Sequence, residues 1–304
     1  MIRPPALPPV PPALPPARVV CLPGRGEVFF RHHVAEGAAD RPTLVLLHGW
    51  TASTDLQWFT AYEELGERYS FVAIDHRGHG RGMRTLERFR LEDAADDVAS
   101  LIEVLGLTKV VVLGYSMGGP ISLHLCHRHP HLVHALVLEA TALEWRATRR
   151  DRSQWWFLLG FEAVLRWRIT FRLQHRAIRR MARQNPGLAS VLPWLVAESR
   201  RGDPTALTDA GRALRDYDAR GFAGEIDVPV GVLRTTKDHV VSPRKQTALA
   251  KAMRAEIVDL PGDHFCTWAQ PALFSAATRR LVDGVVARLD QSAAAEPSGA
   301  SRSI

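Results

Sequence analysis

The run KVVVLGYSMGG, residues 109–119, decides the fold of this 304-residue chain. Its first half is a short, β-branched apolar stretch that ends in glycine, which is typical of a strand buried in a parallel sheet. A G-x-S-x-G sequence between such a strand and the helical pattern of 117–129 predicts a sharp turn, with Ser116 in a strained backbone conformation. Free N–H groups and the positive end of the helix dipole meet at this point, so Ser116 is our candidate nucleophile.

Strands and helices alternate on both sides of this turn. Apolar or alternating runs bounded by turn residues predict further strands at 18–22, 27–33, 43–48, 71–75, 132–139, 228–234 and 256–260. Helical patterns lie between them at 55–69, 91–105, 243–253 and 271–289. This alternation predicts an α/β fold with a doubly wound, mostly parallel sheet.

One long segment, 142–222, interrupts the alternation. It contains no convincing strand and has the pattern of several helices, which predicts a helical cap inserted over the carboxyl edge of the sheet. The expected parts are a proline-rich flexible tail (1–17), an α/β core (18–141 and 223–290), the cap (142–222) and a flexible C-terminal tail (291–304).

A serine hydroxyl needs a base that removes its proton and an acid that orients the base. His264 follows the last short strand in a tight loop, at the same edge of the sheet as Ser116. Asp238 follows the strand before it, which gives the chain order Ser, Asp, His. Two other carboxylates compete with Asp238. Glu139 also ends a strand, and Asp263 abuts the histidine but is poorly placed to bond its neighbour's ring.

Together these motifs resemble the α/β-hydrolase fold superfamily, in its serine-nucleophile branch with a helical cap. The resemblance covers residues 18–290 and depends on five motifs in the family's order: His48-Gly49-Trp50, the turn Asp75–Gly80, the elbow Gly114–Gly118, Asp238 and His264. It implies that the backbone N–H groups of Trp50 and Met117 form an oxyanion hole. By the same resemblance, His48 and the turn after Asp75 are structural. Arg81 after Gly80 and Asp263 before His264 depart from the family pattern.

The residue at the elbow separates branches of this family. Epoxide hydrolases and haloalkane dehalogenases carry an aspartate there, so Ser116 favours acyl transfer to water. We expect a carboxylic-ester hydrolase that acts on a small molecule with an apolar acyl group and needs no cofactor or metal. A carbon–carbon bond or amide hydrolase is the alternative, as is a non-catalytic receptor or interaction scaffold.

The net charge of +7 lies in the predicted cap. Residues 142–222 hold 16 arginines, no lysine and 8 acidic residues, a net charge of +8. Aromatic side chains accompany them, among them Trp145, Trp155, Trp156 and Trp167. Three interpretations stay open: an apolar lid over an acyl pocket, peripheral attachment to an anionic lipid surface, and an arginine site for an anionic substrate.

Other features bear on location and partners. The three cysteines have no metal-like spacing, which favours a reduced, cytoplasmic setting. The N-terminus lacks the apolar core of a signal peptide, and no run of 18 or more apolar residues occurs. No nucleic-acid-binding motif is present, so nucleic acid is not an expected partner.

Overall fold

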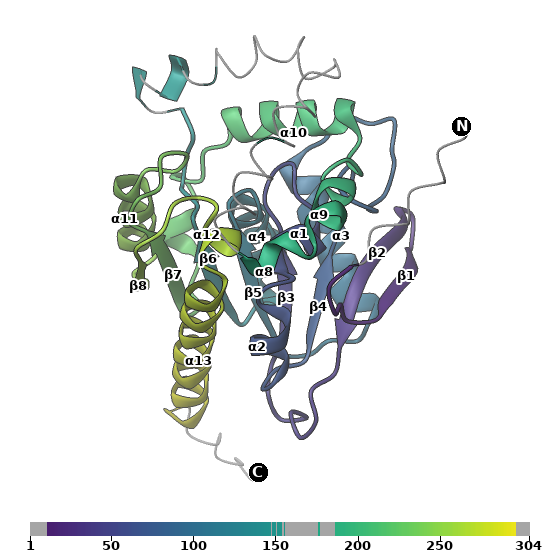
Figure 1. Ribbon diagram of the computed structural model, residues 1–304. Coiled ribbons are helices and arrows are strands. Elements are labelled where there is room, and N and C mark those ends of the chain that lie inside the picture. Colours follow the sequence, from purple (N-terminus) through teal and green to yellow (C-terminus); the bar gives the residue numbers. More distant parts are fainter. Residues whose placement is uncertain are drawn as a thin grey trace, which may run out of the picture.

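The computed structural model describes residues 11–146, 148–149, 151–153, 155, 176 and 186–295. They form an eight-stranded sheet in the order β1-β2-β4-β3-β5-β6-β7-β8 (Figure 1). The strands are β1 (Ala17–Leu22), β2 (Gly26–His33), β3 (Thr43–Leu47), β4 (Phe71–Ile74), β5 (Val110–Tyr115), β6 (Ala135–Glu139), β7 (Val230–Thr235) and β8 (Glu256–Leu260). The doubly wound α/β fold expected from the sequence is confirmed.

Only the N-terminal part of the sheet is antiparallel. Strand β2 runs antiparallel to both β1 and β4, whereas β4, β3, β5, β6, β7 and β8 pair in parallel. In the central register, Gly114 of β5 lies opposite Leu47 of β3, and Tyr115 lies opposite Glu139 of β6. The loops after β3, β5, β6 and β7 therefore leave the sheet at the same edge.

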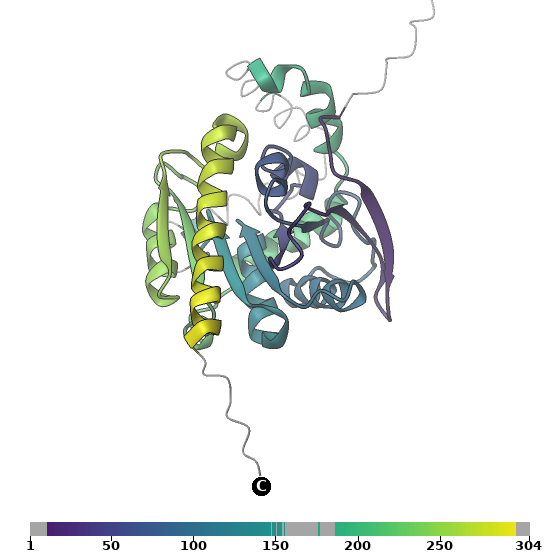
Figure 2. The same ribbon diagram turned by 90° about the horizontal axis from the view of Figure 1, so that it is seen from below.

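Helices cover both faces of the sheet. One face packs against α3 (Leu91–Val104), α4 (Gly118–Arg128) and α11 (Pro243–Ala252). The other packs against α2 (Tyr62–Gly66) and the long α13 (Pro271–Ala295). Figure 2 shows α13 in yellow on one side of the sheet, with α3 and α4 on the opposite side. Fully apolar strands such as β5 suit a sheet that is buried on both faces.

Several elements differ from the sequence prediction. The helix expected over 55–69 is two short ones, α1 (Thr54–Trp58) and α2, because the N–H of Ala61 bonds the carbonyl of Trp58 in a tighter turn. At the end of the tail expected over 1–17, β1 already begins at Ala17, Leu14 packs on the core, and the carbonyl of Pro16 accepts a hydrogen bond from the N–H of His32. The C-terminal tail was expected to begin at 291, but α13 continues to Ala295. Residues 1–10 and 296–304 lie outside the described residues.

The insert between β6 and β7 is helical in its described part. It contains α8 (Pro186–Ala189), α9 (Leu192–Glu198) and α10 (Pro204–Asp216), with the short η2 (Ala223–Glu225) before β7. Figure 1 shows α10 above the edge of the sheet where the parallel strands end. Most of the arginine- and tryptophan-rich stretch, including Trp156 and Trp167, lies outside the described residues. No helix in the described part of the chain is both long and apolar enough to cross a membrane.

Candidate active site

Ser116 lies at the turn between β5 and α4, with the backbone that the motif predicts. Its φ is 52°, in the left-handed region that residues with a side chain rarely adopt. The flanking glycines make the turn possible because neighbouring backbone atoms lie too close to leave room for a side chain. A methyl group on Gly114 would collide with the carbonyl of Gly118, and one on Gly118 would collide with the carbonyl of Leu47. The turn can therefore form only with glycine at both positions.

The end of β6 holds this strained backbone in place. The N–H of Ser116 donates to the carbonyl of Glu139 at 2.9 Å, and the hydroxyl of Thr141 donates to the carbonyl of Ser116 at 2.8 Å. The side chain of Ser116 is thus fixed at the N-terminus of α4, and the residue is 6% exposed. A small exposed fraction of this kind is sufficient for one face of the hydroxyl to meet a substrate.

A hydroxyl, an imidazole and a carboxylate form one continuous chain of hydrogen bonds at this edge. His264 Nε2 lies 3.0 Å from Ser116 Oγ, and its Nδ1 lies 2.8 Å from Asp238 Oδ2. Because a carboxylate only accepts, Nδ1 carries the proton and Nε2 is free to accept from the serine. The structure therefore brings together three of the residues predicted from the sequence, in a geometry that can transfer a proton.

Asp238 is held on both of its oxygens. Oδ1 accepts from the N–H groups of Val240 and Val241 at 2.8 and 2.9 Å, and Oδ2 also accepts from the hydroxyl of Thr235 at 2.8 Å. Burial would raise the pKa of Asp238, but the hydrogen bond and charge of His264, with the donors Val241 and Thr235, lower it below the usual value. The carboxylate is therefore charged at neutral pH and oriented toward the imidazole.

The two competing carboxylates are occupied elsewhere. Glu139 is completely buried, and its Oε1 accepts from the hydroxyl of Thr278 on α13 at 2.7 Å. Burial raises the pKa of Glu139 to about 8, so it is protonated at neutral pH. Asp263 accepts from the N–H of Phe265 at 2.8 Å and closes its own turn. Asp238, rather than Glu139 or Asp263, makes the contact with the imidazole.

The loop that carries His264 is tied to its neighbours by contacts that the sequence did not indicate. The hydroxyl of Tyr115, the residue before the serine, donates to the backbone carbonyl of His264 at 2.8 Å. The N–H of Lys237, beside Asp238, donates to the carbonyl of Gly262 at 3.0 Å. Strand β5 and the loop after β7 thus both hold the histidine loop. Only tertiary structure reveals these bonds, because each joins residues distant in sequence.

The loop after β3 passes directly beside the serine. A methyl group on Gly49 would lie 3.3 Å from the Cβ of Ser116, which puts this backbone in contact with the serine. Thr51 has φ of 62°, and the N–H of Ala52 bonds the carbonyl of Gly49 at 3.3 Å, so the loop is a tight turn. Within the described part of the chain, the backbone N–H groups of Trp50 and Met117 donate to no protein acceptor. Both are therefore available as donors.

The side chain of His48 stabilises this turn through two hydrogen bonds. Its Nε2 accepts from the N–H of His76 at 3.0 Å, so the proton is on Nδ1, which donates to the carbonyl of Gly49 at 2.8 Å. Burial, with the nearby His76 and His79, keeps the pKa of His48 well below its usual value. His48 is therefore a neutral structural residue rather than part of the proton relay.

Asp75 organises the adjacent turn and has no contact with the relay. Its two oxygens accept from the N–H groups of Thr54 and Arg81, at 2.6 and 2.7 Å. Arg81, which departs from the family pattern, keeps this backbone bond and extends its side chain to Glu198 of α9, with two contacts of 2.6 and 2.7 Å. The departure therefore adds an ion pair between the core and the insert.

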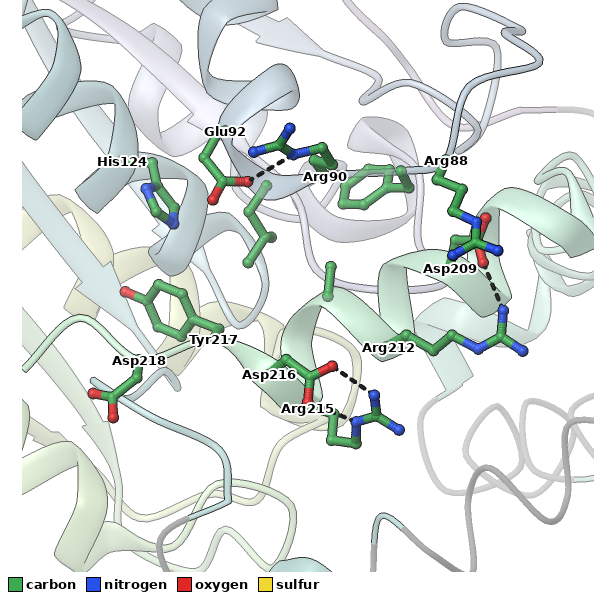
Figure 3. Close-up of a pocket in the computed structure, with 13 residues that line it drawn as sticks. Arg88, Arg90, Glu92, His124, Asp209, Arg212, Arg215, Asp216, Tyr217 and Asp218 are labelled. Atoms are coloured by element: carbon green, nitrogen blue, oxygen red, sulfur yellow. Dashed lines mark hydrogen bonds and ion pairs between the residues drawn. The ribbon is translucent and has the colours of Figure 1, made fainter.

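A separate cavity of about 500 Å³ lies between the N-terminus of α3, α4 and α10 (Figure 3). Six of its charged side chains form three ion pairs: Arg90 with Glu92, Arg212 with Asp209, and Arg215 with Asp216. None of the relay residues lines it. Across the described residues, no cluster of histidine, cysteine and carboxylate side chains has the arrangement of a metal site.

This combination defines a class of protein: a doubly wound sheet whose nucleophile elbow meets an imidazole and a carboxylate at the carboxyl edge. The chain belongs to the α/β-hydrolase fold family, which matches residues 42–270. It is therefore an enzyme of the hydrolase class.

Known proteins similar to this chain include hydrolases of several kinds. The pimeloyl-[acyl-carrier protein] methyl ester esterase of Neisseria meningitidis is 29% identical over 262 residues, 84% of this chain and 78% of that protein. A putative carbamate hydrolase of Agrobacterium fabrum is 27% identical, over 78% of this chain and 91% of the relative. Among solved structures, the enol-lactonase from Burkholderia xenovorans is similar, with a TM-score of 0.72, 21% identity, and coverage of 88% and 98%.

Proposed function

We propose that this protein is a serine hydrolase that cleaves carboxylic esters through an acyl-enzyme, with Ser116 as nucleophile, His264 as general base and Asp238 as the group that orients it. The observation that carries the proposal is the unbroken relay from Ser116 Oγ to His264 Nε2 at 3.0 Å and from His264 Nδ1 to Asp238 Oδ2 at 2.8 Å. The names of the relatives, which include an ester hydrolase and a lactonase, support the same bond type.

In the proposed mechanism, Ser116 Oγ attacks the ester carbonyl carbon while its proton moves to His264 Nε2. The negative charge that forms on the carbonyl oxygen is stabilised by the N–H groups of Trp50 and Met117. Each such donor typically contributes about 3 kcal/mol to the transition state. The intermediate collapses, and the alcohol leaves with the proton from Nε2.

Water completes the cycle in the proposed mechanism. His264 Nε2 removes a proton from a water molecule, whose oxygen attacks the acyl carbon bound to Ser116. The second intermediate returns the proton to Ser116 Oγ and releases a carboxylic acid. Asp238 stays ionised throughout, since it holds the imidazolium in position and takes no proton itself.

An apolar acyl group is the substrate that the insert favours. In its described part, Leu188, Trp194 and Leu195 are buried against Leu56 of α1, next to the loop that holds Trp50. Peripheral contact of the arginine-rich insert with an anionic membrane surface is a separate proposal, which sedimentation with vesicles of anionic against zwitterionic lipid tests.

The proposal is tested with a fluorophosphonate probe and a series of nitrophenyl esters. We expect the probe to modify Ser116, and labelling to be lost in Ser116→Ala but kept in Ser122→Ala, a buried serine of α4 whose hydroxyl bonds Gly118. Turnover should be highest for long acyl chains and should be lost in His264→Ala. Labelling of Ser116→Ala at the parental rate contradicts the assignment. Turnover of amides, or cleavage of a carbon–carbon bond in a ketone, without turnover of esters favours the alternative hydrolases. No turnover at all favours a binding scaffold.

A further inference from the structure

Trp50 connects the proposed oxyanion hole with the insert. Its backbone lies in the tight turn beside Ser116, whereas its side chain extends away toward α10. The indole Nε1 donates to the carbonyl of Leu207 in α10 at 2.7 Å, across 157 residues of sequence. The one residue thus has a backbone N–H at the nucleophile and a side chain fixed to the insert.

The indole is closely confined by α10. A methyl group on Gly211 would lie 2.6 Å from Cζ2 of Trp50, so glycine leaves the only space in which the ring fits against the helix. Trp155 also packs against the indole, with ring centroids 6.1 Å apart and ring planes 39° apart. The ring cannot move without losing either the hydrogen bond to Leu207 or this packing.

Helix α10 is itself anchored to the core, so it is a fixed support. The N–H of Asp203, its N-cap, donates to the carbonyl of Gly78 at 2.8 Å, and its side chain caps the N–H of Ala206. Gly78 has no side chain, and a methyl group there would collide with Ala206. The preceding helix α9 is held through Glu198, which is 2% exposed.

We propose that α10 positions the oxyanion hole, with the indole of Trp50 as the connecting element and Gly211 as the positioning residue that sets its place. The inference rests on the proposed function, because it concerns the donor of that same site. The insert is then part of the catalytic apparatus as well as a cover, and displacement of the indole moves the Trp50 N–H away from the developing oxyanion.

The test is a double-mutant cycle of Gly211→Ala and Trp50→Phe, measured as kcat and KM on a nitrophenyl ester. Loss of an oxyanion donor costs about 10²–10³-fold in kcat, so a displaced donor in Gly211→Ala should cost at least about tenfold, with KM unchanged. Alanine is a better helix former than glycine, so the substitution does not weaken the intrinsic helix propensity of α10. If Gly211→Ala keeps the parental thermal stability, its lower kcat does not come from unfolding. In the Trp50→Phe background the smaller ring leaves room for the methyl group, so there Gly211→Ala should change kcat less than about twofold.

Gly224→Ala is the matched control, since its methyl group meets nothing within 4 Å, and it should keep the parental kcat. The inference is overturned if Gly211→Ala keeps the parental kcat, or if it lowers kcat by the same factor in both backgrounds. Fluorophosphonate labelling of Ser116 in the parent separates the two proposals. A parent that labels and turns over, with no effect of Gly211→Ala, refutes this inference alone, whereas a parent that does neither refutes both.

Discussion

Asp238→Asn should leave the active site assembled but place the proton on the wrong nitrogen of His264. In the parent, the side chain of Asp238 is oriented by two backbone donors, Val240 and Val241, which both bond Oδ1. An asparagine must direct its carbonyl oxygen at these N–H groups, and its NH₂ then faces His264 Nδ1. That nitrogen has to accept, so the proton moves to Nε2, where it points at the oxygen of Ser116.

An imidazole in this tautomer cannot remove the serine proton. We expect kcat to fall by about 10⁴-fold, the scale of the wrong-tautomer effect in other triads, with KM little changed. Asn keeps the shape of the carboxylate, and the hydroxyl of Thr235 can reverse its hydrogen bond by rotation. The amide of Gln246, which donates to Oδ2 at 3.4 Å, loses this acceptor, so we expect a small loss of stability beside the large loss of kcat. Unfolding in urea measures the stability of the variant, and steady-state kinetics on a nitrophenyl ester measure its kcat and KM.

Asp263→Asn is the matched control, since this carboxylate stands beside the same histidine and, among the described residues, accepts a hydrogen bond only from the N–H of Phe265. It should change kcat by less than about threefold, on the scale of a surface hydrogen bond. If Asp238→Asn keeps more than a tenth of the parental kcat while folded, another carboxylate orients the base and the reasoning above is refuted.

Three further variants test the surroundings of the relay. Tyr115→Phe removes the donor to the carbonyl of His264, and a net hydrogen bond of about 0.5–1.5 kcal/mol predicts a two- to tenfold lower kcat with unchanged KM. Glu139→Gln should reduce the pH dependence of stability. With a folded pKa of about 8, Glu139 ionises first in the unfolded parent, so this group lowers the stability as pH rises from about 4.5 to 8, by at most about 1.4 kcal/mol per pH unit. Burial raises the pKa of Asp75 to about 7, so Asp75 adds a slope of its own that the variant keeps. Glu198→Gln removes the carboxylate that pairs with Arg81 through two contacts, while Arg81 keeps its contact with Asp55 at 3.3 Å, and we expect about 2 kcal/mol lower stability in urea unfolding.

Control variants and contradicting outcomes test these three predictions. Tyr217→Phe removes a buried hydroxyl that has no partner within the described residues, and it should keep the parental kcat. Asp216→Asn breaks a half-exposed pair and should change stability little. Parental kcat in Tyr115→Phe means that other contacts fix the histidine loop. A pH slope in Glu139→Gln as steep as the parent's means that Glu139 contributes none of it, and an unchanged stability of Glu198→Gln means that the pair only offsets its own desolvation.

The sequence determined the α/β fold, the turn at Ser116 and the order of Asp238 and His264, because these depend on local patterns. A buried strand, a glycine-flanked turn and a helix start each leave a signature within a few residues. Parallel strands then end at one edge, so three residues at strand ends, although far apart in the chain, are expected to meet. The boundaries of tails and helices were less accurate, since packing of Leu14 and Ala61 decided them.

Only the tertiary structure decided which groups hold those residues in place. The bond from Tyr115 to the carbonyl of His264, the indole of Trp50 on α10 and the pair of Arg81 with Glu198 each join segments more than a hundred residues apart. No local pattern marks such a contact, because its energy depends on the distance and burial of both partners in the folded chain. The sharp turn at Ser116 could be predicted from eleven residues, but the contacts that support it required the positions of all the elements around it.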